Sequence, residues 1–281
     1  MRKAPGKGRG VFAGQPFAEG EVIERVPVVV LPREQRRFVD ATVLWHYYFK
    51  WPPHDGVLAF PLGHAMIYNH SGTPNAVWHG NPDENLMDFV AVRPIAAGEE
   101  ITHNYGGPKS QMPMWFELDE GPLRRRRNAV LRAVVRARGT GTQAEADAGD
   151  RLPHYSEGER HGVWTQRALA AGEVIERAPV IAIPPHEAWV LSQTDLAPYL
   201  IAGRGKRGSM AFPLGLAPMC SHSDEPNAAL VPSEDDLVVD VIATRPIVAE
   251  GEVLVGWPER HADETGPLAS MAEKLLGRVL R

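Results

Sequence analysis

The sequence repeats itself at a fixed offset of 152 residues. The segment Gly-Glu-Val-Ile-Glu-Arg at 20–25 recurs unchanged at 172–177, and Ala-Phe-Pro-Leu-Gly at 59–63 recurs at 211–215. Shorter matches keep the same offset: His70-Ser71 with His222-Ser223, Pro74-Asn75-Ala76 with Pro226-Asn227-Ala228, and Arg93-Pro94-Ile95 with Arg245-Pro246-Ile247. Chance does not preserve one register across so many blocks, so the chain is predicted to contain one module twice.

The period of the repeat sets the size of the module. Because 152 residues is far longer than a solenoid unit, each copy is predicted to be a small domain. We place the first domain at 1–120, a helix and flexible linker at 121–150, and the second domain at 151–281. Apolar residues at helical spacing predict helices over 122–138 and near the end of the second domain.

The register is predicted to slip once, shortly after the last matching block. Aligning Ala-Gly-Glu at 97–99 with Ala-Glu-Gly-Glu at 249–252 requires one extra residue in the second copy. The sequence therefore predicts a single-residue insertion in the turn that precedes the last strand.

Composition favours a β-rich fold in a reducing compartment. The 27 glycines and 25 prolines show no period, which is typical of many short strands joined by turns. The lone Cys220 excludes an internal disulfide and a cysteine-based zinc cluster, so no metal site is expected. No apolar stretch is long enough to span a bilayer, and the start of the chain does not resemble a secretory signal, so we expect a cytoplasmic protein without a membrane anchor.

The net charge of −5 arises from the C-terminal part of the chain, residues 151–281. Residues 151–281 carry 12 basic and 18 acidic side chains. This distribution disfavours nucleic acid as the main partner. It fits a basic partner such as a lysine-rich peptide, although a solvated acidic surface is the simpler explanation.

Three blocks of the first copy contain polar residues that a purely structural account does not demand. They are Lys-Gly-Arg-Gly at 7–10, Tyr-Asn-His-Ser-Gly-Thr-Pro-Asn at 68–75, and Ala-Gly-Glu-Glu-Ile-Thr-His-Asn-Tyr-Gly at 97–106. Taken singly, each has an ordinary explanation as a turn, or as a strand ending in a core tyrosine. Taken together, their order and spacing resemble the SET-domain family of protein lysine methyltransferases, over about 6–116 and more weakly over 158–257.

The resemblance implies a mainly β architecture. Each copy would be a SET-like β-clip of small curved sheets and short helices, and the two would lie in tandem. In each copy the C-terminal segment would pass the Asn-His strand as a pseudoknot, a rare topology. This threading would bring the glycine turn, Asn69 and Tyr105 together.

The resemblance also implies S-adenosyl-L-methionine as the cofactor. Gly8, Arg9 and Gly10 would contact its methionine part, while Asn69 and the backbone of His70 would hold its adenine end. Glycines suit such a turn because they let a backbone approach a ligand closely.

By the same analogy, Tyr105 is the predicted catalytic residue. Its hydroxyl would orient a lysine amine that a dry aromatic channel keeps neutral. Tyr48 and Tyr68 are candidate channel walls, although core packing explains both equally well. His103 is the third candidate channel residue. It departs from the family's pattern, because the family often has a tyrosine at this position.

Many relatives close the site with a zinc-binding cysteine cluster after the domain, which this sequence lacks. An aromatic segment, Met-Trp-Phe at 114–116, follows instead. Small relatives without the cluster cover the cofactor with such a segment. Trp115 is therefore the candidate lid over the cofactor.

The second copy has lost residues in all three blocks. At the aligned positions, Arg160-His161 replaces Gly8-Arg9, Cys220-Ser221 replaces Tyr68-Asn69, and Gly256-Trp257 replaces Asn104-Tyr105. The second copy is predicted to keep the fold and bind no cofactor. Because some small relatives act as homodimers, the two copies are predicted to form an intramolecular pseudo-dimer.

The leading hypothesis is a methyltransferase that acts on lysine side chains of a protein or peptide through the first copy. A catalytically inactive SET-like module that binds peptides is the main alternative, and His103 is the feature that supports it. A methyltransferase acting on another kind of substrate is the third possibility.

Overall fold

The structure is a computed structural model that describes residues 1–4, 6–51, 56–107, 154–155, 162–203, 208–233 and 237–257. We call 1–107 the first half and 154–257 the second half. The predicted helices at 122–138 and near the C-terminus, the predicted linker, Trp115, and Arg160-His161 lie outside the described residues. No helix within the described ranges is long and apolar enough to cross a bilayer.

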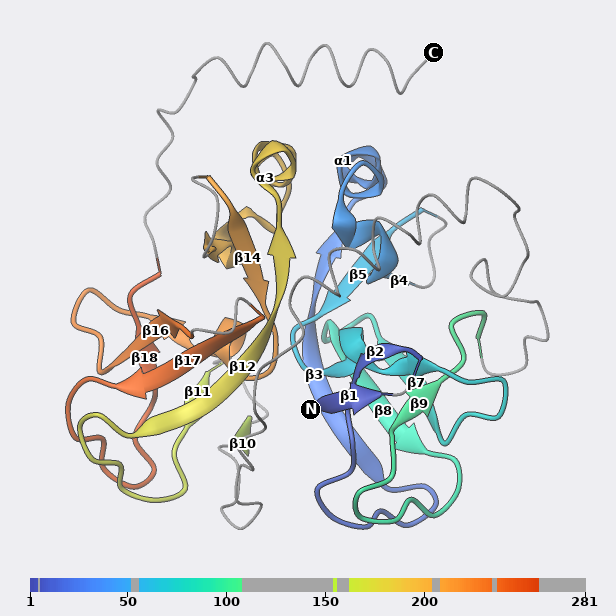
Figure 1. Ribbon diagram of the computed structural model, residues 1–281, viewed down its shortest axis with the longest axis horizontal. Helices are drawn as coiled ribbons and strands as arrows, with labels where there is room; N and C mark the ends of the chain where they lie inside the picture. Colours follow the sequence, from blue (N-terminus) through green and yellow to red (C-terminus); the bar gives the residue numbers. More distant parts are fainter. Residues whose placement is uncertain are drawn as a thin grey trace.

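The first half is built from short strands and single-turn helices (Figure 1). Its strands are β1 (Arg2–Ala4), β2 (Gly8–Gly10), β3 (Val22–Leu31), β4 (Phe49–Lys50), β5 (Leu58–Pro61), β6 (Asn69–His70), β7 (Ala76–Asn81), β8 (Leu86–Ala91) and β9 (Thr102–His103). Its helices are η1 (Arg33–Gln35), α1 (Arg36–Asp40), η2 (Val43–His46) and η3 (Ala65–Ile67). The strand order is β4-β5-β3-β8-β7 in the main sheet, with separate pairs β1-β2 and β6-β9.

The second half repeats this order of elements. Its strands are β10 (His154–Tyr155), β11 (Val163–Trp164), β12 (Val174–Ile183), β13 (Ile201–Ala202), β14 (Met210–Pro213), β15 (Ser221–His222), β16 (Ala228–Pro232), β17 (Val238–Ala243) and β18 (Leu254–Val255). Its helices are α3 (Pro185–Leu191), η4 (Ala197–Tyr199) and η5 (Ala217–Met219). Within the described residues the strand order of its main sheet is β13-β14-β12-β17-β16-β18-β15, and β10 and β11 form a separate pair.

The long central strand of each half changes partner at a proline. β3 pairs with β8 as far as Pro27 and with β5 from Val28 onward. Pro27 has no N–H to give to a ladder, and its carbonyl accepts the amide of Leu62 at 3.0 Å. Pro179 stands at the same place in β12. This change of partner curls each sheet, as expected for a SET-like β-clip.

A threaded segment at the end of the first half joins residues far apart in sequence. The carbonyl of Glu99 accepts the amide of Ala13 at 2.8 Å, and the amide of Ile101 donates to Val11 at 2.9 Å. The next residues form β9, which runs parallel to β6 and pairs Asn69 with Thr102. The segment thus lies between the N-terminal residues and the Asn-His strand, as the pseudoknot prediction requires.

The predicted one-residue insertion is wrong, because the offset of 152 residues continues through the turn. The amide of Gly98 donates to Ala13, and the amide of Glu250 donates to Thr165, 152 residues further on in both partners. Gly98 has φ of 81°, and Glu250 takes the same left-handed conformation with φ of 58°. The sequence alignment matched glycine to glycine, whereas the backbone places a glutamate in the glycine's conformation.

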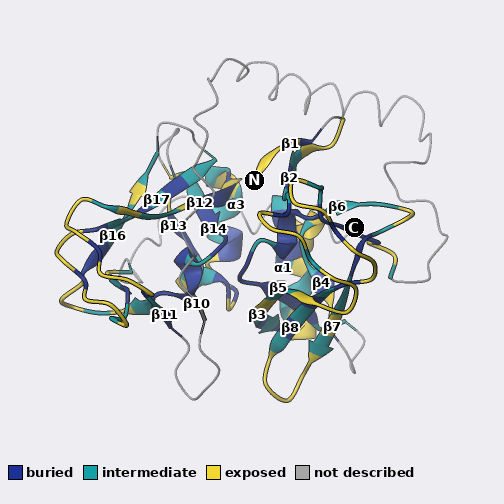
Figure 2. Ribbon diagram, turned by 90° about the horizontal axis from the view of Figure 1, so that it is seen from below, coloured by how far each residue is buried: buried dark blue, intermediate teal, exposed yellow. Residues whose placement is uncertain are grey.

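The two halves pack against each other over a shared apolar core. In Figure 1, α1 of the first half lies beside α3 of the second half. Phe60 faces Phe212 across the boundary with ring centroids 6.3 Å apart, and both rings belong to one continuous cluster of buried residues. Figure 2 shows buried residues on the side of each half that faces the other. The amide of Val43 also donates to Glu187 of α3 at 2.6 Å.

Candidate functional site

The N-terminal turn of the first half leaves no room for a side chain at its end. Gly8 has φ of 88°, a conformation that favours glycine. A Cβ atom on Gly10 would lie 2.6 Å from Oε1 of Glu100 and 2.9 Å from Nδ2 of Asn69. The spacing Gly-Arg-Gly therefore lets the turn fit directly against the strand that carries Asn69.

Asn69 joins the three polar blocks. Its Nδ2 donates to the carbonyl of Arg9 at 2.9 Å and to Oε1 of Glu100 at 2.7 Å. Nζ of Lys7 donates to the carbonyl of His70 at 3.0 Å and lies 3.8 Å from Oε2 of Glu100. The sequence singled out Asn69 and its neighbours but missed Glu100, whose only signal was its place in the third block.

Tyr105 lies at the end of the threaded segment, beside β6. Its hydroxyl donates to the carbonyl of Tyr68 at 2.9 Å, and its amide donates to Nδ1 of His70 at 3.2 Å. The residue as a whole is 44% exposed, but desolvation of its hydroxyl, and then the neighbouring Tyr47, raise the pKa of Tyr105 to about 12. The hydroxyl therefore remains protonated at neutral pH and acts as a hydrogen-bond donor.

His103 is buried next to Tyr105. It is 4% exposed, its ring stacks on Phe49 at 5.4 Å, and its centroid lies 4.8 Å from that of Tyr105. Burial, and then the neighbouring His70, lower the pKa of His103 to about 3, so the ring is neutral at neutral pH. Within the described part of the chain its Nδ1 has no hydrogen-bond partner.

The other two predicted channel residues have different surroundings. Tyr68 is buried, its hydroxyl donates to Glu24 at 3.0 Å, and it meets Tyr105 through its backbone carbonyl. The hydroxyl of Tyr48 donates to Asp40 at 3.0 Å, on the side of α1. Its neighbour Tyr47, which the sequence did not single out, is the tyrosine that contributes to the raised pKa of Tyr105.

Asn75 holds the threaded segment in place. It is 1% exposed, its Nδ2 donates to the carbonyl of Glu100 at 2.8 Å, and its Oδ1 accepts the amide of Thr102, also at 2.8 Å. Asn227 makes the equivalent bonds in the second half. Its presence in both copies indicates a role in the fold.

The second half keeps the frame of the site with other side chains. Oγ of Ser221 donates to Glu252 at 2.6 Å, where Asn69 donates to Glu100. Nε1 of Trp257 donates to the carbonyl of Cys220 at 3.0 Å, where the hydroxyl of Tyr105 donates to Tyr68. An indole thus replaces the phenol and provides no hydroxyl at this place.

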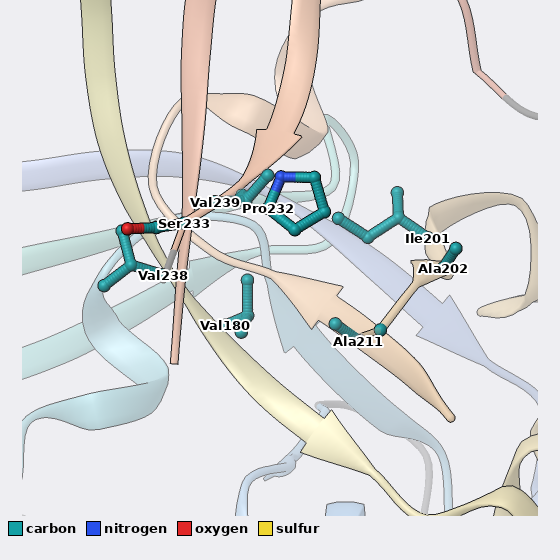
Figure 3. Close-up of a pocket in the computed structure, with 9 residues that line it drawn as sticks. Val180, Ile201, Ala202, Ala211, Pro232, Ser233, Val238 and Val239 are labelled. Carbon is teal, nitrogen blue, oxygen red and sulfur yellow. The ribbon is translucent and has the colours of Figure 1, made fainter. Parts of the chain in front are cut away.

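A small pocket of the second half is explained by a missing side chain (Figure 3). Its lining is largely apolar and consists of Val180, Ile201, Ala202, Gly203, Ala211, Pro232, Ser233, Val238 and Val239. Trp51 occupies the position equivalent to Gly203 in the first half and is 4% exposed. Its ring lies against Gly80, where a Cβ would come within 2.8 Å of it. Loss of the tryptophan leaves this space, so the pocket gives no evidence of a ligand.

Known proteins resemble part of the chain. The family model of the SET domain matches residues 8–106. A histone-lysine N-methyltransferase of Schizosaccharomyces pombe, specific for H3 lysine-37, is 31% identical over 118 residues, which are 42% of this chain and 76% of the yeast protein.

Two solved structures are also similar in part. A Plasmodium falciparum protein assigned as a histone methyltransferase is 28% identical, with a TM-score of 0.29 over 37% of this chain and 94% of the other. The SET8 protein of Cryptosporidium is 20% identical, with a TM-score of 0.33 over 40% and 58%.

A threaded β fold that brings a glycine turn, an Asn-His strand and a tyrosine together defines the SET class of domains. The chain belongs to the SET-domain family of lysine methyltransferases.

Proposed function

We propose that the chain is a protein-lysine N-methyltransferase that uses S-adenosyl-L-methionine, and that the first half carries the reaction. The observation that supports this most directly is the position of Tyr105. Its hydroxyl is fixed on the carbonyl of Tyr68, next to the junction of Asn69 with the glycine turn. A protonated hydroxyl beside backbone carbonyls can orient an amine and an incoming methyl group.

The residues around the glycine turn fit the cofactor. A Cβ on Gly8 would meet no atom within 4 Å, so the outer side of the turn is open. Lys7 and Arg9 would provide cations for the carboxylate of the methionine part, and Glu100 would provide an anion for its ammonium group. Asn69 and the backbone of His70 would hold the adenine end. When bound, the cofactor supplies a methyl group on a positively charged sulfur.

The side chains next to Tyr105 suit a lysine substrate. The amine must be neutral to use its lone pair for the new C–N bond as the C–S bond breaks. Phe49 and His103 offer a wall without charge, which disfavours the ammonium form. His103 is smaller than the tyrosine common in the family, and its neutral ring adds no positive charge near the sulfonium.

We propose that the second half arose by duplication and is catalytically inactive. Ser221 and Trp257 stand where the first half has Asn69 and Tyr105, so the second half lacks both the amide and the phenol. Its acidic composition would attract a lysine-rich substrate toward the first half.

The test is methyl transfer by the full chain from methyl-labelled S-adenosyl-L-methionine to a lysine-rich peptide. The parent should label lysine. Tyr105→Phe should reduce kcat about 100-fold or more while leaving cofactor affinity unchanged, because it removes one positioned donor.

Cofactor binding has its own matched pair of variants. Gly10→Ala should weaken binding about tenfold, because its methyl group would push Asn69 and Glu100 apart. Gly14→Ala is the control, since a Cβ there would meet nothing within 4 Å. A parent chain that binds the cofactor, as measured by calorimetry, but labels no lysine would instead favour the peptide-binding module.

A further inference from the structure

A pair of equivalent glutamates lies at the boundary between the halves. Glu24 and Glu176 are 152 residues apart, and each carboxylate packs against the glycine that ends an Ala-Phe-Pro-Leu-Gly segment. A Cβ on Gly63 would come within 2.3 Å of Glu24, and one on Gly215 within 2.2 Å of Glu176. This close approach explains why the two longest identical blocks of the repeat are the ones that contain these residues.

Each carboxylate also caps the loop that follows its glycine. Oε1 of Glu24 accepts the amide of His64 at 2.7 Å, and Oε2 of Glu176 accepts the amides of Leu216 at 2.9 Å and Ala217 at 3.1 Å. The amide of Gly215 donates to the carbonyl of Gly63 at 3.2 Å, which joins the two loops directly.

One side chain breaks the symmetry of this arrangement. The residue after the glycine is His64 in the first half and Leu216 in the second. Nδ1 of His64 lies 3.5 Å from Oε1 of Glu24, and its Nε2 lies 3.8 Å from Oε1 of Glu176. A single imidazole therefore lies between two carboxylates, one from each half.

The charges around His64 favour its protonated form. Burial opposes that form, but the hydrogen bond and charge of Glu24, together with the charge of Glu176, outweigh it and raise the pKa of His64. The amino group of Met1 acts in the opposite direction. Cys220 also faces Glu176, and burial chiefly raises the pKa of its thiol, so it remains neutral.

A chain of contacts continues from His64 to the site. Oε2 of Glu24 accepts the hydroxyl of the buried Tyr68 at 3.0 Å, and the carbonyl of Tyr68 accepts the hydroxyl of Tyr105 at 2.9 Å. Glu176 of the second half is thus connected to Tyr105 of the first half through His64, Glu24 and Tyr68.

We propose that Glu176 is a positioning residue for methyl transfer by the first half, acting through His64, Glu24 and Tyr68 on the hydroxyl of Tyr105. This inference rests on the proposed function. It gives the second half a role in the reaction although that half lacks the reacting groups. Small displacements of a positioned group have large effects on rate, so the connection matters even without a contact to substrate.

Glu176→Gln tests the connection while preserving shape. Glu187→Gln is the matched control, because Glu187 also crosses the boundary, to the amide of Val43, but has no part in the contacts that lead to Tyr68. In Glu176→Gln we expect kcat to fall about tenfold with KM for the cofactor unchanged. The pKa of His64, followed by NMR of the labelled imidazole, should fall because one carboxylate is neutralised. Glu187→Gln should change neither.

A double-mutant cycle with Tyr68→Phe separates positioning from general weakening of the fold. Because Glu176 and Tyr68 act through one chain, the double variant should lose little more kcat than Tyr68→Phe alone. Glu187→Gln combined with Tyr68→Phe should show no such coupling. Two results would overturn the proposal. One is a double variant whose loss of kcat equals the product of the losses in Glu176→Gln and Tyr68→Phe. The other is an equal loss of kcat in Glu176→Gln and Glu187→Gln.

A readout that needs no turnover distinguishes this proposal from the proposed function. In the chain with 13C-labelled tyrosine, the Tyr105 resonance should shift in Glu176→Gln and remain in place in Glu187→Gln. If the parent transfers no methyl group but the Tyr105 resonance shifts in Glu176→Gln, the proposed function fails and the connection from Glu176 to Tyr105 is supported. If the parent is active and neither kcat nor the resonance changes in Glu176→Gln, the connection is overturned.

Discussion

At the scale of single residues, His103 makes the fold sensitive to acid. The folded chain holds this ring neutral with a pKa of about 3, whereas the unfolded chain takes up a proton below about pH 6.5. His103 therefore has no effect on stability above that pH, and destabilises the fold progressively as the pH falls toward 3. At pH 5 this loss in the free energy of unfolding amounts to about 2 kcal/mol.

His103→Phe should remove this loss while keeping a ring stacked on Phe49. The measurement is denaturant unfolding of the parent and the variant at pH 7 and pH 5. We expect the parent to lose about 2 kcal/mol more than the variant between the two pH values. Equal losses in both chains would show that His103 is protonated without cost in the folded state.

At the scale of elements, the turn before the last strand differs between the halves in one residue. Gly98 adopts its left-handed conformation without penalty, whereas Glu250 adopts the same conformation with a Cβ atom. Glu250→Gly should stabilise the chain by about 0.5–1 kcal/mol, since the relief of strain exceeds the entropy cost of a glycine.

Gly98→Ala is the reciprocal variant of that experiment. A Cβ there would meet no atom within 4 Å, so any loss comes from the backbone alone, and we expect about 1 kcal/mol of destabilisation. Thermal unfolding of both variants checks the pair. A lower midpoint for Glu250→Gly would indicate that its side chain contributes more than its backbone conformation costs.

The same turn shows how far the sequence could predict the elements. The glycine and proline content, together with the resemblance to SET domains, correctly predicted a mainly β fold. The alignment of the repeat failed at Glu250, since a residue's sequence does not reveal a left-handed φ that the surrounding backbone imposes. Glu100 was missed for a similar reason, because its role depends on threading that places it against Asn69.

At the scale of the whole molecule, the shared core predicts that the two halves unfold together. Residues of both halves form one buried cluster, in which Phe60 and Phe212 are fully buried. A first half produced alone would lose the contact of Phe60 with Phe212 and expose apolar surface there, and such a surface favours association. Cooperative unfolding of the complete chain is therefore the sharper test.

Phe212→Ala removes the ring of the second half that faces Phe60 across the boundary. Truncating a buried phenylalanine costs about 3–5 kcal/mol, and in a shared core this loss applies to both halves. Methyl transfer after heating should therefore decline at a lower temperature, in parallel with a single unfolding transition followed by circular dichroism. Phe89→Ala, within the first half's own core, should give a similar shift. Suppose instead that Phe212→Ala produced a separate early unfolding transition while activity persisted to the temperature at which the parent loses it. The two halves would then unfold independently, and the shared core would not support a dependence of Tyr105 on Glu176.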